Sequence, residues 1–302
     1  MRAAAILGLG CSAKDLKPFQ TDATVEWRIG VPASGHETDV ILIFGGDGTI
    51  HRHLGQLVRL GLPVLIVPAG SGNDFARAIG LRRVRDSLAA WQKFRGGGCN
   101  VHTVDLGVIT TDPSDANNDP TGVPAFRYYC CVAGVGLDGE VSRRANRLPR
   151  WLRGNGGYAL TLIPTIFRFS PLPVKISVPA ENSTADDSSG WTVRSNQPTT
   201  LAAFANTPVY GGGMKIAPQA RMDDGLLDVC LVAGVDRFKL VCLFPTVYGG
   251  RHLNIREVEY FQTARLRVET EHRLDVYADG EYVCPTPVEV TVRADALRIV
   301  TP

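Results

Sequence analysis

The sequence predicts an α/β fold followed by an all-β section. Strands and helices alternate through the first third of the chain, short β-like runs dominate from about Val101, and 302 residues with 44% hydrophobic content supply an ample core. We therefore expect an N-terminal α/β domain with a mostly parallel sheet over residues 1–104. A β-sandwich-like domain is expected over residues 105–302, and its extreme C-terminus can pack back on the first domain.

The elements of the first part follow from apolar runs and helical periodicity. The expected strands are Ala3–Gly8, Val25–Ile29, Val40–Phe44 and Pro63–Val67. The expected helices are Ile50–Leu60, Asn73–Ile79 and Arg85–Phe94. Gly61 suits the end of the first helix, and Gly96–Gly98 marks a turn. This alternation predicts parallel pairing in a doubly wound sheet.

The second part contains β-like runs separated by polar segments. The expected strands are Val101–Ile109, Phe126–Val132, Val174–Val178, Thr200–Ala205, Leu227–Val232, Ala264–Val268, Leu274–Ala278 and Val288–Val292. Two segments rich in Asp, Asn, Ser and Pro, Thr111–Pro124 and Ala180–Pro198, are expected to be exposed hairpin loops. A helical stretch is expected over Val141–Phe169.

Composition narrows the class of protein. The net charge of +2 gives no global support for a nucleic-acid partner. Seven scattered cysteines without a C-x-x-C pair favour free, mostly buried thiols in a reducing cytoplasm. The apolar start of the chain favours a first buried strand over a short signal sequence. No apolar run reaches the ~18–20 residues that span a bilayer, so any membrane contact is expected to be peripheral.

Gly45-Gly46-Asp47-Gly48-Thr49 directly follows a strand of apolar residues. Glycine turns expose backbone N–H groups that form anion-binding nests, and a helix starting near Thr49-Ile50 would aim its positive end at the same place. A carboxylate beside phosphate needs a cation between them, which points to Mg²⁺. A turn without a ligand is the alternative at this point.

A second glycine turn, Gly70-Ser71-Gly72-Asn73-Asp74, follows the next strand. Ligands sit at the carboxyl ends of parallel strands, so the two turns describe one phosphate site. Ser71 and Asn73 can donate to phosphate or ribose oxygens. Asp74 is either a helix N-terminal acid or a second charge near the metal.

Three further motifs could be ordinary turns or parts of a functional site. They are Asp279-Gly280-Glu281, Tyr210–Gly213 and Asp223–Asp228. Turn chemistry explains each of them locally, and the residues alone do not decide between the two possibilities. His51 and His53 lie two apart on one helix and do not share a face, which argues against a metal site there. Neither a G-x-S-x-G elbow nor a G-x-x-x-x-G-K-[ST] loop occurs, so a hydrolase triad and an ordinary P-loop lack support.

A basic stretch lies between Arg143 and Arg153. Its five arginines surround Trp151, and the apolar segment Tyr158–Phe169 follows. Basic residues with an interfacial Trp suit contact with anionic lipid headgroups. A solvated helix face beside a core helix is the alternative.

Taken together, the motifs resemble the diacylglycerol kinase catalytic-domain family, which includes bacterial lipid kinases and is related to the sphingosine and ceramide kinases. Six motifs in family order carry the likeness over nearly the whole chain. They are Gly45–Thr49, Pro68–Arg77, Gly134–Glu140, Tyr210–Pro218, Asp223–Asp228 and Asp279–Glu281.

The resemblance implies roles for individual residues. Nucleotide binding would fall to the two glycine turns, that is to Gly45, Gly46, Asp47, Gly48, Thr49, Gly70, Ser71, Gly72, Asn73 and Asp74. Asp47, Asp74 and Asp279 would organise Mg²⁺ and its waters. Glu281 matches the acid that accepts the proton of the lipid hydroxyl. A separate structural Mg²⁺ would be held by Asp224 and the carbonyls of Arg221 and Leu226.

The resemblance implies an ATP- and Mg²⁺-dependent lipid kinase that acts on a hydroxyl of a diacylglycerol-like or sphingoid-like lipid. Phosphoryl transfer needs positioning and charge neutralisation more than covalent help, which agrees with the nests and the acids. The expected protein is cytoplasmic, peripherally membrane-associated through the Arg143–Arg153 region, and compatible with a homodimer. The alternatives are a non-catalytic lipid-binding or regulatory protein on the same scaffold, or a soluble-substrate kinase such as an NAD kinase.

The sequence departs from the family pattern in two places. An Asn-Glu pair usually follows the first glycine turn, and His51-Arg52 stands there instead. A cation thus replaces an acid, so that either Mg²⁺ handling is weaker or Arg52 meets a phosphate itself. The usual Asn-Pro-x-Ser-Gly turn is replaced by Leu9-Gly10-Cys11-Ser12, and the segment up to Val40 leaves little room for a full helix.

Overall fold

The structure, a computed structural model, describes residues 1–111, 126–145, 158–180 and 190–302. Most of the two expected polar loops therefore lies outside the described residues. So do Trp151 and three of the five arginines of the basic stretch, Arg147, Arg150 and Arg153. No helix in the described ranges combines the length and the hydropathy that are needed to cross a bilayer.

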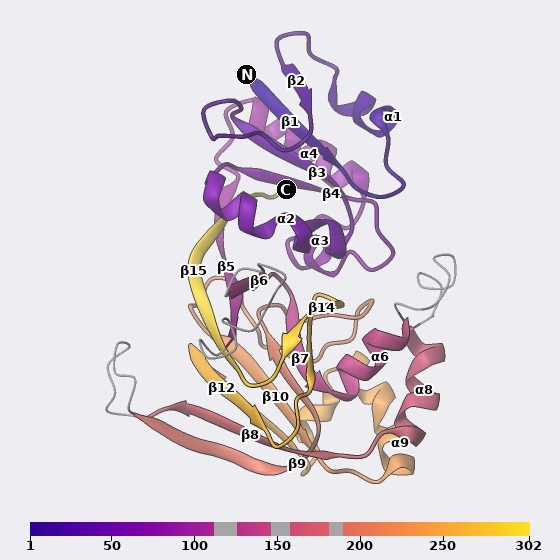
Figure 1. Cartoon of the computed structure of the whole chain (residues 1–302). Coiled ribbons are helices and arrows are strands. Elements are labelled where there is room, and N and C mark those ends of the chain that lie inside the picture. Colours follow the sequence, from indigo (N-terminus) through magenta and orange to yellow (C-terminus); the bar gives the residue numbers. More distant parts are fainter. Residues whose placement is uncertain (112–125, 146–157, 181–189) are drawn as a thin grey trace.

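The α/β lobe, at the top of Figure 1, holds four parallel strands in the order β4-β3-β1-β2. These strands are β1 (Arg2–Leu7), β2 (Glu26–Ile29), β3 (Val40–Gly45) and β4 (Val64–Pro68). Its helices are α1 (Ala13–Leu16), the short 3₁₀ helix η1 (Lys17–Phe19), α2 (Asp47–Leu60), α3 (Asp74–Ala78) and α4 (Val84–Arg95). All six residues of β3 are buried, as expected for a parallel strand covered on both faces.

The β lobe below it is built mainly of antiparallel strands. They are β5 (Val101–Thr111), β6 (Phe126–Tyr129), β7 (Val132–Gly136), β8 (Leu172–Pro179), β9 (Trp191–Ala205), β10 (Leu227–Ala233), β11 (Val258–Thr263), β12 (Arg265–Thr270), β13 (Asp275–Ala278), β14 (Glu281–Pro285) and β15 (Val288–Val300). Its helices are α6 (Leu137–Ala145), α8 (Tyr158–Arg168), α9 (Arg237–Tyr248) and the 3₁₀ helix η3 (Arg251–Asn254). Figure 1 shows α6, α8 and α9 grouped on one side of the lobe.

Two long strands join the lobes. β15 pairs antiparallel with β5 and β12, and its Ile299 then pairs in parallel with Val64 of β4. Figure 1 shows β15 and β5 rising together into the α/β lobe. β5 passes through residues 104 and 105 without a break, and the register of β15 against it shifts between Arg293 and Leu297. The expected domain boundary at residue 104 stays a prediction.

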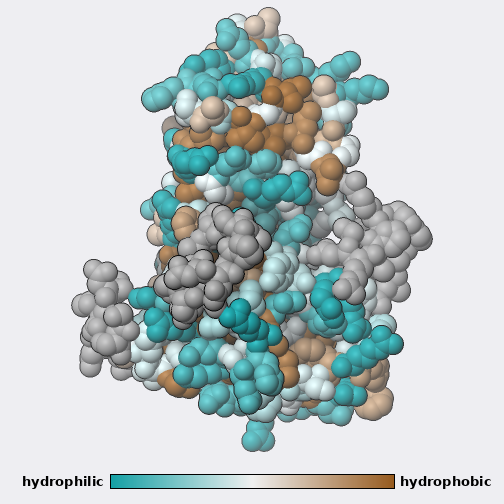
Figure 2. Space-filling view, in the orientation of Figure 1, coloured by the Kyte–Doolittle hydropathy of each residue, from teal (hydrophilic) through white to brown (hydrophobic). Residues whose placement is uncertain are grey.

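In the described part of the chain, the buried hydrophobic residues form three clusters. The largest surrounds the parallel sheet and takes in Leu297 and Ile299 from β15. A second lies between the strands of the β lobe, and a small third cluster lies under α6, α8 and α9. In the view of Figure 2, hydrophobic residues form a band across the α/β lobe, and hydrophilic residues predominate lower down.

Two expected boundaries were wrong for physical reasons. The helix expected from Thr49-Ile50 begins at Asp47, because Gly46 is extended and takes the N-cap position. The single strand expected over Phe126–Val132 is two strands separated at Cys130-Cys131. The backbone N–H groups of these two cysteines donate to a carboxylate, so they are not available to a strand ladder.

Other elements were missed because their patterns are weak. Trp191–Pro198, expected to be loop, belongs to β9 and pairs with β8; its side chains are mostly exposed, which removes the alternation of a half-buried strand. Helix α9 was not expected, since its apolar residues do not gather on one face and it contains Pro245. The segment before Val40 does contain a short helix, α1, which Ser12 caps.

Candidate active site

The two glycine turns lie against each other at the carboxyl ends of β3 and β4, where Gly45 pairs with Pro68. A Cβ placed on Gly46 would lie 2.7 Å from the Cα of Gly70, and one on Gly70 would lie 2.4 Å from the Cα of Gly46. Any side chain at either position would push the turns apart. Glycine is required here because two backbones pass at contact distance.

Asp47 is the first residue of α2, and its carboxylate also caps α3. It accepts hydrogen bonds from the backbone N–H groups of Asp74, at 3.0 Å, and Phe75, at 3.1 Å. Burial, which removes hydration, and then the negative charge of Asp74 raise the pKa of Asp47 to about 6. The hydrogen bonds from the two N–H groups lower this pKa and offset part of the rise. The helix N-termini thus hold an acid in a site already rich in negative charge.

The second turn is closed by its own side chains. Asn73 adopts a left-handed backbone (φ 55°), accepts from the N–H of Gly70 at 2.8 Å, and donates to the carbonyl of Gly70 at 2.7 Å. Its amide therefore holds the turn. Asp74 is 5% exposed and accepts from the N–H of Gly212 at 2.9 Å, which ties α3 to the Tyr210–Gly213 segment of the β lobe. Burial raises the pKa of Asp74.

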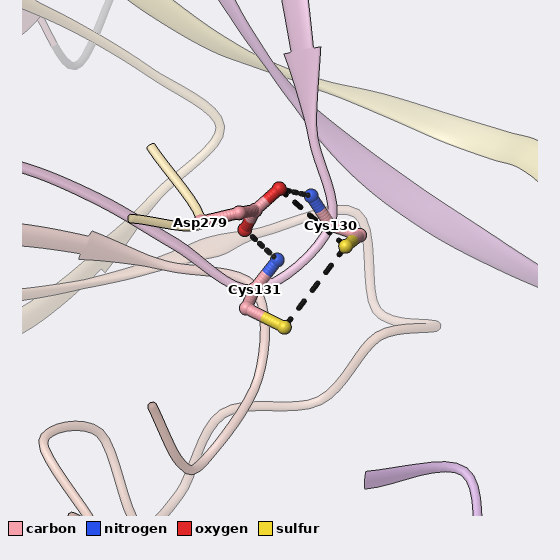
Figure 3. A group of neighbouring side chains, drawn as sticks. All are labelled: Cys130, Cys131 and Asp279. Atoms are coloured by element: carbon pink, nitrogen blue, oxygen red, sulfur yellow. Dashed lines mark hydrogen bonds between the residues drawn. The ribbon is translucent and has the colours of Figure 1, made fainter. Parts of the chain in front are cut away.

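Asp279 lies in the turn between β13 and β14, and its side chain is fully buried. It accepts from the N–H groups of Cys130, at 2.9 Å, and Cys131, at 2.8 Å (Figure 3). Nδ1 of His51, on α2, lies 3.0 Å from the same carboxylate. Asp279 has a left-handed backbone (φ 52°), a conformation that Asp tolerates better than most residues. Contacts from the connection between β6 and β7 and from α2 hold it in place.

Cys130, Cys131 and Asp279 form a group of three potential ligands whose atoms lie within 4.8 Å of one another. Burial raises the pKa of the Cys130 thiol well above its ordinary value, and the pKa of Cys131 is raised to about 12. Cys130 Sγ lies 3.5 Å from Asp279 as a donor, beside the two cysteine N–H groups that donate to the same carboxylate. In this arrangement the two cysteines support the Asp279 carboxylate.

Glu281 begins β14, two residues after Asp279, and is exposed. A Cβ on Gly48 would lie 2.8 Å from Glu281 Oε1, so this carboxylate faces the first turn of α2. Glu281 is the acid of the site that water reaches most freely, and it lies beside the phosphate-binding turn predicted from the sequence.

One cavity of about 650 Å³ unites these features. The predicted residues that line it are Gly46, Asp47, Gly48, Thr49, Gly70, Ser71, Gly72, Asp74, Asp279 and Glu281. Gly45 and Asn73 do not line it. Sequence reasoning gave no role to Arg77, Asp138 and Tyr210, which also line the cavity. All three stand in the motifs of the family resemblance, which is the signal that could have found them.

The residues expected to hold a structural metal lie elsewhere. Arg221, Asp224 and Leu226 do not line the cavity. The Arg221 side chain donates to Asp223 at 3.1 Å, and Asp224 accepts from the N–H of Leu226 at 3.1 Å. Asp105 braces this turn by accepting from the N–H of Gly225. A metal site at this turn stays a prediction.

A small apolar cavity of about 80 Å³ adjoins the first one, and the two share Asp138 and Tyr210. Aliphatic and aromatic side chains from α6, α8 and α9 and from the neighbouring segments form its walls. They include Leu137, Leu162, Met214, Leu240, Phe244 and Val247. A polar cavity with acids and backbone nests thus opens beside an apolar one.

The chemistry of this arrangement favours phosphate. Burial raises the pKa of both Asp47 and Asp74, and nearby negative charge adds to the rise: that of Asp74 for Asp47, and that of Asp279 for both. A divalent cation would relieve this, and carboxylates are the ligands that Mg²⁺ prefers. Helix N-termini and glycine turns supply N–H donors for phosphate oxygens. The donor set therefore fits Mg²⁺ with a nucleotide phosphate.

Comparison with known proteins agrees with this geometry. Residues 20–109 match the diacylglycerol kinase catalytic domain family, and residues 131–301 match the YegS C-terminal NAD kinase beta sandwich-like domain family. A diacylglycerol kinase of Mycobacterium tuberculosis is 34% identical over 265 residues, which are 88% of this chain and 77% of the relative. A diacylglycerol kinase of Bacillus subtilis is 24% identical over 272 residues, covering 89% of this chain and 80% of the relative.

The fold also matches solved structures. The structure of a diacylglycerol kinase from Bacillus anthracis superposes with a TM-score of 0.64 at 17% identity, covering 100% of this chain and 97% of that one. At this identity the match speaks for the fold. It agrees with the expected combination of an α/β part and a β-sandwich-like part.

Proposed function

The chain belongs to the diacylglycerol kinase family of lipid kinases, and on that premise we propose that it transfers the γ-phosphate of ATP, with Mg²⁺, to a hydroxyl of a diacylglycerol-like or sphingoid-like lipid. The observation that carries the proposal is the single cavity that brings both glycine turns together with Asp279 and Glu281. The glycine turns and the Asp279–Glu281 segment are separated by more than 200 residues in the sequence.

Residue roles follow from position. The N–H groups of the two glycine turns would bind the phosphates of the nucleotide, with Ser71 at the exposed edge of the cavity. Asp47 and Asp74 would hold Mg²⁺ or its waters, and Asp279 would contribute from the facing turn. When bound, Mg²⁺ neutralises phosphate charge in such sites. Asp279 already accepts several hydrogen bonds, which favours a contribution through water.

Glu281 is proposed as the base that accepts the proton of the lipid hydroxyl. It is exposed, and it faces Gly48 in the turn that would hold the phosphates. An acceptor hydroxyl between Glu281 and the glycine turn would meet both groups at once. For base catalysis, such a carboxylate must lie within hydrogen-bond distance of the hydroxyl.

The apolar cavity supports a lipid acceptor. It shares Asp138 and Tyr210 with the polar cavity, so that a lipid with its hydroxyl near Glu281 could lay the adjoining part of its chain against the apolar walls. Apolar walls with few polar groups are typical of sites that bury hydrophobic ligands.

Peripheral membrane contact is proposed at the ends of α8 and α9. Phe238 is 71% exposed and stacks edge to face with Phe167, which is 40% exposed. Exposed aromatic residues of this kind suit the membrane interface. Arg143 and Arg144, from the basic stretch, both donate to Glu140, so part of their charge is used within α6.

The test is phosphoryl transfer from γ-labelled ATP to a panel of diacylglycerols, sphingoid bases and ceramides in mixed vesicles, with and without Mg²⁺. We expect label in at least one lipid, and only with Mg²⁺ present. Absence of transfer to every lipid by folded protein would contradict the proposal. Transfer to NAD⁺ in place of lipid would show a soluble-substrate kinase.

A further inference from the structure

Acids outnumber cations among the described residues that line the polar cavity. These residues supply five carboxylates and two guanidinium groups. The acids are Asp47, Asp74, Asp138, Asp279 and Glu281, and the cations are Arg52 and Arg77. A triphosphate adds several more negative charges, and one divalent cation cannot offset all of them. The guanidinium groups are therefore important for holding the phosphates.

Arg77 is already engaged with the protein. Its Nη2 donates to the carbonyl of Gly72 at 3.0 Å, and its Nη1 lies 3.4 Å from Asp74 Oδ1. Arg77 thus helps to hold the second glycine turn in shape. Its positive charge already partly neutralises Asp74, which weakens its attraction for the phosphates of a ligand.

Arg52 is placed differently. It lies on α2 four residues after Gly48, so both are on the same face of the helix, and the Gly48 position faces Glu281 Oε1. Arg52 is exposed, and within the described part of the chain no side chain forms a hydrogen bond or ion pair with it. Its guanidinium group can therefore reach the space between the first glycine turn and Glu281.

We propose that Arg52 binds the γ-phosphoryl group of ATP and stabilises its charge during transfer. The inference rests on the proposed function, since it concerns the same cavity. Guanidinium groups bind phosphate oxygens in a bidentate manner and stay charged, which suits the developing charge of phosphoryl transfer. The chain would thus place a cation of its own between the first glycine turn and Glu281.

The test compares Arg52→Met with Arg52→Lys and a matched control, Arg59→Met. Arg59 lies on the same face of α2 two turns further on and is also exposed, but it lines only a neighbouring groove. Calorimetry measures ATP and ADP affinity with Mg²⁺, and transfer assays measure kcat and KM. Thermal unfolding checks that each variant folds.

We expect Arg52→Met to weaken ATP binding about tenfold and to leave ADP binding unchanged, because only ATP carries the γ-phosphate. We expect kcat of Arg52→Met to fall by about 10²-fold or more. Arg52→Lys should retain part of the wild-type kcat, because Lys keeps the positive charge but cannot bind two phosphate oxygens in the bidentate manner of Arg. Arg59→Met should match wild type in every measurement.

Unchanged ATP and ADP affinities together with unchanged kcat in Arg52→Met would overturn the inference. Equal weakening of ATP and ADP would also overturn it, because Arg52 would then contact another part of the nucleotide. A wild-type protein that transfers phosphate to no lipid would contradict the proposed function, and the ratio of ATP to ADP affinity would still decide the role of Arg52.

Discussion

The buried histidine His252 shows how the surroundings of a single residue change its pKa. It is 3% exposed, its Nε2 lies 3.0 Å from the carbonyl oxygen of Ile216, and burial lowers its pKa. The folded protein therefore holds His252 neutral, with Nε2 as the donor. The unfolded chain would take up a proton at this residue more readily than the folded protein does.

This makes His252 a source of acid sensitivity. Below the ordinary His pKa of 6.5, the unfolded state binds more protons than the folded state, so the free energy of unfolding should fall as pH decreases. We expect wild type to lose more stability than His252→Gln between about pH 7.5 and pH 5.5, measured by urea unfolding. Gln keeps an N–H donor for Ile216 without the titration. Equal losses in the two proteins would contradict this account.

The sequence singled out Asp47, Asp74, Asp279 and Glu281, which the structure brings to one cavity, but it could not predict how they are held. Asp47 and Asp74 follow two strands that the apolar runs made evident, so their proximity was foreseeable. The support of Asp279 by Cys130 and Cys131 depends on residues 149 and 148 positions away, and no local pattern carries that information. Nor did the sequence indicate that the amide of Asn73 closes its own turn; its contact with a ligand stays a prediction.

At the scale of elements, the site depends on two strand–turn–helix units that touch through glycine. β3 and α2 form one unit, β4 and α3 the other, and Asp47 links them by capping α3. Strand ends and glycine turns gave clear signals in the sequence. Helix α9 and strand β14 did not, because the apolar residues of α9 surround the helix and β14 is largely exposed.

The contact between the units leads to a direct prediction. Gly46→Ala should force the turns apart, since its Cβ would lie 2.7 Å from Gly70, and we expect ATP affinity to fall by about tenfold or more. Gly55→Ala is the matched control, because it lies on the same helix with no atom within 4 Å of its Cβ. It should keep full affinity and gain up to about 1 kcal/mol of stability. Calorimetry and thermal unfolding measure both, and normal ATP binding by Gly46→Ala would count against the two-turn site.

At the scale of the whole molecule, β15 connects the lobes. Residues near its start pair with β12 in the β lobe, and Ile299 near its end pairs with β4 in the α/β lobe. The sequence predicted a strand only over Val288–Val292, because the later part, Arg293 to Ala296, interrupts the apolar pattern at the register shift. The cavity between the lobes therefore depends on a strand that pairs with strands of both lobes.

Weakening β15 should affect both lobes. Ile299 is fully buried, so Ile299→Ala should cost about 2–5 kcal/mol. We expect amide hydrogen exchange to speed up in β4 and in β12 together. Val193→Ala, at a residue 51% exposed on β9, should leave exchange unchanged. Faster exchange confined to the α/β lobe would show that the lobes unfold independently.

The central claim is that the cavity is a lipid kinase site in which Glu281 accepts the proton of the acceptor hydroxyl. The most direct measurement is kcat for phosphoryl transfer to lipid by Glu281→Gln, alongside its affinity for ATP with Mg²⁺. We predict that kcat falls by about 10²–10⁴-fold while ATP affinity stays at the wild-type level. Turnover close to wild type in the folded Glu281→Gln variant would contradict the claim.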